Sequence, residues 1–273
     1  MKKSFILYLV SALFSSTCLT AQLPLVLTAK VNGFTQAHGD YGQLSEVEVI
    51  ALETGKKMAT SGEDGTFSFE YPIGEQLTLM FKHGDYHPSQ SATIVVQPSD
   101  GNDQKKNFFT YQAISYSKTE LITWTRHLPE FAPKIKNDHC QMIVTVAGKN
   151  KTLYDNEQGE EGAELLINYW PTKKNTSRLP GTADTFHQCY YGTLPIFHTN
   201  PTCIGSKTSP DGGVFVSNIP SDNQQMYKVL AHKPQVSFSH AFIQCRKDWW
   251  EEHAPEHYYK LINLSPPNGP TVQ

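Results

Sequence analysis

The chain has 273 residues, a formal net charge of -3, 38% hydrophobic residues and 18% charged residues, which is the composition of a globular protein. Its 18 Gly and 17 Pro are too few for a collagen-like or low-complexity chain. The 23 basic residues are scattered along the sequence, which argues against a broad nucleic-acid-binding surface. The length permits one large domain or two small ones.

The first 21 residues have the order of a secretory signal peptide. Lys2 and Lys3 precede the apolar run Phe5–Phe14, and small and polar residues follow it. This run has about half of the roughly 20 apolar residues that a membrane-spanning helix needs. We therefore predict cleavage near Ala21 and a secreted or periplasmic mature chain without a membrane span. The alternatives are an uncleaved anchor and a lipoprotein attached through Cys18.

The first half after this segment contains short runs of strand-forming residues separated by turn residues. In Thr66–Glu70, for example, Phe67 and Phe69 share one face, as in a strand with one solvated side. The preceding Asp64-Gly65 is a short-range hairpin signal. The predicted strands are Val26–Phe34, Glu46–Leu52, Lys57–Thr60, Thr66–Glu70, Gln76–Phe81, Ala92–Val96 and Asn107–Gln112.

The second half repeats this plan after a proline-containing linker at residues 114–138. Asp211-Gly212 matches Asp64-Gly65 in position and context. The predicted strands here include Gln141–Val146, Glu164–Tyr169, Tyr227–Ala231, Ala241–Cys245 and Leu261–Leu264, with a long insertion at 171–207 and a tail at 267–273. We predict an all-β protein made of two tandem antiparallel β-sandwiches, at residues 22–113 and 139–266.

Four cysteines remain once Cys18 is removed with the signal. An even number in an oxidising compartment favours two disulfides, whereas zinc is disfavoured because no two cysteines have CxxC spacing. Three pairings are possible. We expect Cys189–Cys203 to staple the insertion and Cys140–Cys245 to clamp the second half.

The first half also carries a family resemblance. Val31-Asn32-Gly33, Val47-Glu48-Val49, Asp64-Gly65-Thr66-Phe67 and His83-Gly84-Asp85-Tyr86 resemble the carboxypeptidase regulatory-like, or transthyretin-like, domain. The resemblance covers residues 27–112 well and residues 140–266 more loosely. It implies small β-sandwiches that serve as binding or spacer modules in exported bacterial proteins.

A second and looser resemblance gives an enzyme alternative. Segments of the second half, including Asn168-Tyr169-Trp170 and Asp211-Gly212-Gly213-Val214, resemble the intradiol dioxygenase core. That family holds ferric iron with two tyrosines and two histidines. The residues that the resemblance places near such an iron are Tyr191, Tyr227, His232 and His240. The Arg-Pro-x-His-x-His segment of that family is replaced here by Ala231-His232-Lys233-Pro234, so we expect no enzyme.

The tetrapeptide His-Gly-Asp-Tyr occurs twice, at residues 38–41 and 83–86. Counting alternate strands places both copies and the Asp64 turn at the same end of the first sandwich. Imidazoles and carboxylates gathered there suit a divalent transition metal, although Gly-Asp also simply makes turns. The candidate metal ligands are His38, Asp40, Asp64, His83, Asp85 and His87; no other cofactor is expected.

A second candidate site is the aromatic segment that follows Ala241–Cys245. Its large rings, at Trp249, Trp250, Tyr258 and Tyr259, stand beside acidic residues. Exposed rings of this kind stack on sugars or anchor proteins, whereas buried ones cover the end of a core. We therefore predict a secreted, non-catalytic module that binds a protein or carbohydrate ligand. The alternatives are the metal-dependent enzyme and a structural spacer of a surface or secretion assembly; the oligomeric state stays open.

Overall fold

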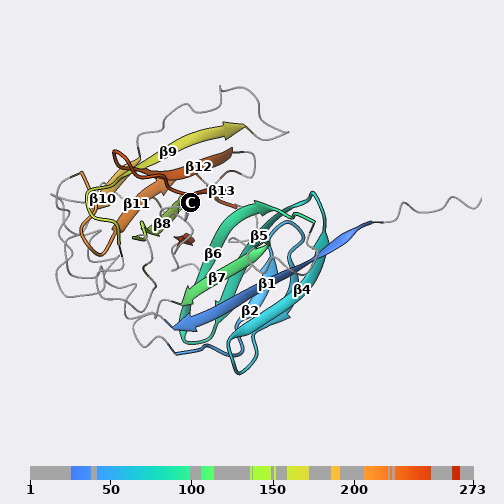
Figure 1. The fold of residues 1–273 in the computed structure, drawn as a ribbon. Helices are drawn as coiled ribbons and strands as arrows, with labels where there is room; N and C mark the ends of the chain where they lie inside the picture. Colours follow the sequence, from blue (N-terminus) through green and yellow to red (C-terminus); the bar gives the residue numbers. More distant parts are fainter. Residues whose placement is uncertain are drawn as a thin grey trace, which may run out of the picture.

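The structure, a computed structural model, describes residues 26–37, 42–98, 106–113, 136, 138–148, 151, 159–171, 186–190, 206–220, 222, 225–246 and 260–264. Every regular element in these ranges is a β-strand, which confirms the predicted fold class (Figure 1). The described ranges include no helix long and apolar enough to cross a membrane.

The first sandwich consists of two sheets from the first half of the chain. One sheet has the order β4-β1-β7, and the other has the order β3-β2-β5-β6. Between them lies a core in which the rings of Phe81 and Tyr111 stack with centroids 4.6 Å apart. The strands are β1 (Thr28–Ala37), β2 (Glu48–Ala51), β3 (Lys56–Thr60), β4 (Thr66–Pro72), β5 (Gln76–His83), β6 (Tyr86–Val95) and β7 (Phe108–Ala113).

The second sandwich is built from the second half in the same way. Its two layers have the orders β9-β12-β13 and β10-β11-β8-β14, and β6 links both of them with β3-β2-β5 into one hydrogen-bonded sheet of 11 strands. The core between the two layers includes Tyr169 and Tyr227, whose rings meet edge to face. The strands are β8 (Cys140–Thr145), β9 (Glu164–Pro171), β10 (His187–Tyr190), β11 (Gly213–Ile219), β12 (Gln225–His232), β13 (His240–Ile243) and β14 (Lys260–Leu264).

Strand pairing supports the internal repeat that the sequence predicts. In the first sandwich β1 pairs antiparallel with β4 and parallel with β7, and in the second β8 pairs antiparallel with β11 and parallel with β14. The pairs β2–β5 and β5–β6 have the counterparts β9–β12 and β12–β13. Even the turns correspond, because the carbonyl of Gly65 accepts from the N–H of Thr35 as that of Gly212 accepts from Val146.

The Asp64-Gly65 turn does not join a hairpin, so this prediction is wrong. The strand before it, β3, pairs with β2, whereas the strand after it, β4, pairs with β1 in the other sheet. Gly65 has a φ of 73°, and a Cβ there would lie 2.5 Å from the carbonyl oxygen of Thr35. The turn therefore carries the chain from one sheet to the other and docks against the end of β1.

Strand β6 joins the two sandwiches. It pairs antiparallel with β13 through Phe242 and Thr93 and parallel with β14 through Ser89 and Gln90, so it meets both sheets of the second sandwich. Figure 1 shows β6 at the side of the first sandwich that faces the second. Buried polar residues therefore line β6: His87, Ser89, Gln90, Ser91 and Thr93.

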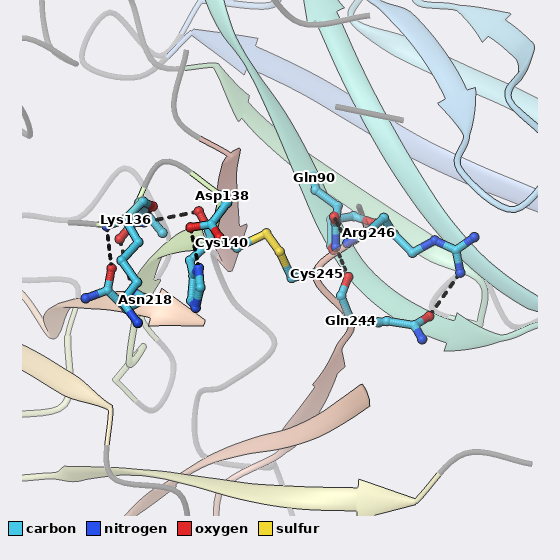
Figure 2. The surroundings of a disulfide bond; sticks show 11 residues. Gln90, Lys136, Asp138, Cys140, Asn218, Gln244, Cys245 and Arg246 are labelled. Atoms are coloured by element: carbon cyan, nitrogen blue, oxygen red, sulfur yellow. Dashed lines mark hydrogen bonds and ion pairs between the residues drawn. A yellow bond between two sulfur atoms is a disulfide. The ribbon is translucent and has the colours of Figure 1, made fainter. Parts of the chain in front are cut away.

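Hydrogen bonds and a disulfide reinforce this junction (Figure 2). The amide of Gln90 donates to the carbonyl of Gln244 at 2.6 Å and accepts from the N–H of Arg246 at 3.3 Å. The Arg246 guanidinium reaches back to the carbonyl of Leu52 at 3.5 Å. Cys245, between these two partners of Gln90, is bonded to Cys140 of β8. The disulfide within the second sandwich and the hydrogen bonds between the two sandwiches therefore involve adjacent residues, Gln244 to Arg246.

Candidate ligand-binding face of the second sandwich

The sheet β9-β12-β13 has one side in the core and one side open. Along each strand, alternate residues such as Tyr169, Val229 and Ile243 point into the core. The intervening residues therefore lie on the opposite side of the sheet. We call the central part of this side the aromatic face and define it by Leu166, Asn168, Trp170, Met226, Lys228, Leu230, His240 and Phe242. Glu164 and His232 lie beyond it on the same side, and Met226 is buried.

Strand register places these eight residues in a compact grid. Lys228 of β12 is paired with Asn168 on one side and with Phe242 on the other, so these three form a row across the sheet. Leu230 forms the next row with Leu166 and His240. Large apolar side chains remain open to solvent, since Leu166 is 39% exposed and Trp170 is 38% exposed.

Three rings of the aromatic face contact one another in series. The ring centroids of Trp170 and Phe242 are 5.5 Å apart with the planes tilted by 55°, and the ring of His240 contacts Phe242 edge to face at 5.2 Å. The Nζ atom of Lys228 lies 5.6 Å from the centroid of Trp170, within cation–π distance. The face thus presents an indole ring with a cation over it.

The surroundings of His240 favour its neutral form. Partial burial lowers the pKa of His240, and the charge of Lys228 lowers this pKa further. A neutral imidazole has both a hydrogen-bond donor and an acceptor. Besides the rings of Trp170 and Phe242, the aromatic face therefore offers the ammonium group of Lys228, the amide of Asn168 and the imidazole of His240.

Sequence reasoning placed the aromatic site elsewhere. Trp249, Trp250, Tyr258 and Tyr259 lie outside the described residues, so their ligand-binding role stays a prediction. The signal that would have found the aromatic face is the run Leu165 to Trp170, where apolar residues occupy both sides of a strand. One side of such a strand packs in the core, and the apolar residues on the other side are available to contact a ligand.

The predicted disulfides have one confirmed pair. Cys140 and Cys245 are bonded, with Cα atoms 5.8 Å apart. Cys189 of β10 is also disulfide-bonded, but Cys203 lies outside the described residues, and the Cys189–Cys203 pairing stays a prediction. Two disulfide-bonded sites are consistent with an extracellular, oxidising environment.

The predicted metal ligands of the first sandwich are only partly described. His38 and Asp40 lie outside the described residues, and no three described His, Cys, Asp or Glu side chains are close enough to hold a metal. The carboxylate of Asp64 accepts from the N–H and hydroxyl of Thr66, which is a turn-forming role. The ring of His83 accepts from the N–H of Asp85. The metal site therefore stays a prediction.

The described members of the alternative iron site do not converge. Tyr227 lies on the core side of β12, 1% exposed, and its hydroxyl donates to the Gln225 side chain at 2.6 Å. His232, on the same strand, and His240, on β13, belong to the opposite side of the sheet. Tyr191, the fourth residue, is outside the described part. Tyr227 and these two histidines therefore cannot bind a common iron.

His87, one of the predicted ligands, is buried, and this burial is expected to make the fold sensitive to acid. Burial lowers its pKa to about 4, against the opposing effect of a 2.8 Å hydrogen bond between Nδ1 and the carbonyl of Pro88. As pH falls from 6.5 to about 4, the unfolded chain binds a proton at this position before the folded chain does. Folding stability therefore decreases across this range.

We expect His87→Gln to flatten this pH dependence. From pH 7 to pH 4.5, wild type should lose roughly 2 to 3 kcal/mol more unfolding free energy than the variant, measured by urea denaturation. Glu53→Gln is the opposite control. Burial raises the pKa of Glu53, so its protonation stabilises the fold on acidification, and its removal should steepen the loss. An unchanged profile in His87→Gln would assign the acid sensitivity to another group.

Comparisons with known proteins give no family assignment. No protein-family model matches the sequence. A search among curated proteins also finds no match. The resemblance to carboxypeptidase regulatory-like domains therefore stays a prediction.

Among solved structures the overlap is long but loose. The Bacillus anthracis TIE protein matches with a TM-score of 0.24 and 7% identity over 89% of this chain, which spans 34% of that chain. A Streptococcal ancillary pilin matches with a TM-score of 0.23 and 12% identity over 90% of this chain, which spans 63% of that chain. The shaft pilin SpaA from Lactobacillus rhamnosus GG matches with a TM-score of 0.26 and 8% identity over 90% of this chain, which spans 99% of that chain. All three TM-scores are below 0.5, so the fold rests on the strand pairings alone.

Proposed function

We propose that this protein is an exported, non-catalytic binding module whose ligand contacts the aromatic face. The observation that carries the proposal is the contact between Trp170 and Phe242 on the open side of a sheet whose other side already fills the core. Trp170 itself is not part of that core. Exposed apolar groups gathered on one surface are typical of interaction sites.

Two further features support the proposal. The rings are mounted on paired strands rather than on a loop, so their positions are fixed before a ligand arrives, and this lowers the entropic cost of binding. The Cys140–Cys245 disulfide supports export, because such bonds persist in oxidising compartments. The predicted signal peptide at residues 1–21 agrees with export and lies outside the described residues.

We expect Trp170→Ala to weaken ligand binding by at least roughly tenfold, because exposed aromatic anchors carry a large share of binding energy. The measurement is a combined glycan and protein array, followed by titration of each ligand that wild type binds. Phe108→Ala is the matched control, since Phe108 is a similarly exposed aromatic residue, 46% accessible, on β7 of the other sandwich.

The array result separates the alternatives. A ligand that binds wild type and Phe108→Ala equally but not Trp170→Ala supports the proposal. If Trp170→Ala keeps the full wild-type profile, the aromatic face is not the binding site. If wild type binds no ligand at all, the structural spacer becomes the better description of the molecule.

A further inference from the structure

The size of the aromatic face restricts what it can bind. Its eight residues lie on three adjacent strands, so the face is about 10 Å wide and about 14 Å long. A standard protein interface uses about 20 to 30 residues on each side. The described part of the face is therefore smaller than a standard protein interface and matches a short oligosaccharide in size.

The chemistry of the face restricts the ligand further. The C–H groups on one side of a pyranose ring carry partial positive charge and pack on the electron-rich face of an indole such as Trp170. The amide of Asn168 and the imidazole of His240 offer donors and acceptors to hydroxyl groups. Lys228 supplies a cation within 5.6 Å of the indole centroid, so a negative substituent on a stacked ring lies within its reach.

We propose that the aromatic face binds an acidic carbohydrate, with a uronic acid ring stacked on Trp170 and its carboxylate paired with Lys228. This inference rests on the proposed function and names its ligand class. Glu164, the acidic residue on the same side of β9, lies six residues before Trp170, or roughly 20 Å away along the strand. Its carboxylate is 3.7 Å from the ammonium of Lys207, which further reduces repulsion of an acidic ligand.

The test is calorimetric titration of the full disulfide-bonded protein with uronate tetrasaccharides. The panel contains tetramers of galacturonate, glucuronate and mannuronate, each beside its neutral counterpart of the same linkage. We expect at least one uronate tetramer to bind roughly tenfold more tightly than its neutral counterpart, with the preference shrinking as salt rises. Trp170→Ala should weaken binding of both, whereas Trp170→Phe should retain part of it.

Lys228→Gln provides the specific readout for charge. It should reduce uronate affinity to that of the neutral tetramer, and Lys82→Gln, an exposed lysine of β5 in the first sandwich, should change neither. Equal affinity for acidic and neutral tetramers would overturn the assignment of an acidic ligand. Binding of no tetramer, together with Trp170-dependent binding of a protein on the array, would overturn the carbohydrate and keep the proposed function. No Trp170-dependent binding at all would overturn both.

Discussion

Replacing Cys140 and Cys245 together with alanine is expected to lower the free energy of unfolding by about 4 to 5 kcal/mol. The two cysteines are 105 residues apart, and a cross-link that closes a loop of about 100 residues removes roughly that much entropy, as free energy, from the unfolded chain. Both side chains are fully buried, so alanine leaves no unsatisfied polar group behind. Urea denaturation of the double variant measures the loss directly.

The second disulfide-bonded site provides the comparison. If Cys189 is bonded to Cys203, as predicted, the loop is short, and the corresponding double alanine variant should lose about 3 kcal/mol. Peptide mapping under non-reducing conditions identifies the partner of Cys189. A Cys140→Ala/Cys245→Ala protein as stable as wild type would show that this clamp does not hold the second sandwich together.

Phe81→Ala should have an effect of similar size in the first sandwich, about 3 to 5 kcal/mol. Phe81 is 1% exposed, stacks on Tyr111 at 4.6 Å and contacts Phe67 at 5.9 Å, so its removal leaves a cavity lined by rings. The same substitution at Phe108, which is 46% exposed, should cost under about 1 kcal/mol. The measurement is urea denaturation of both variants. Equal losses would mean that burial of Phe81 does not stabilise the fold.

The strands were predictable where alternation and turns are clear. Thr66–Glu70 and Glu164–Tyr169 lie within β4 and β9 because each puts apolar residues regularly on one side. Strand β6 was predicted only from Ala92, six residues after its start. The residues that follow its start are mostly polar and do not alternate with apolar ones. The second sandwich buries this part of the strand, so it lacks the pattern of one buried and one solvated side.

The candidate site was less predictable than the fold. Trp170 occurs in the sequence directly after a predicted strand, but its contact with Phe242 depends on the pairing of β9, β12 and β13. The contact between Gln90 and Gln244 joins residues 154 positions apart and involves only uncharged polar groups, which have no distinctive pattern. Short β10 lies inside the insertion at 171–207 and was not predicted, because only four residues form it.

The sharing of β6 has a consequence for how the protein avoids aggregation. A strand at the border of a sheet exposes unpaired backbone groups that can recruit a strand from another molecule. In a chain of two separate sandwiches, β6 and its counterpart β13 would each be such a border. Here these two borders, together with that of β14, are joined to one another. Pairing the two sandwiches thus joins three borders that separate sandwiches would have to protect by charge or proline.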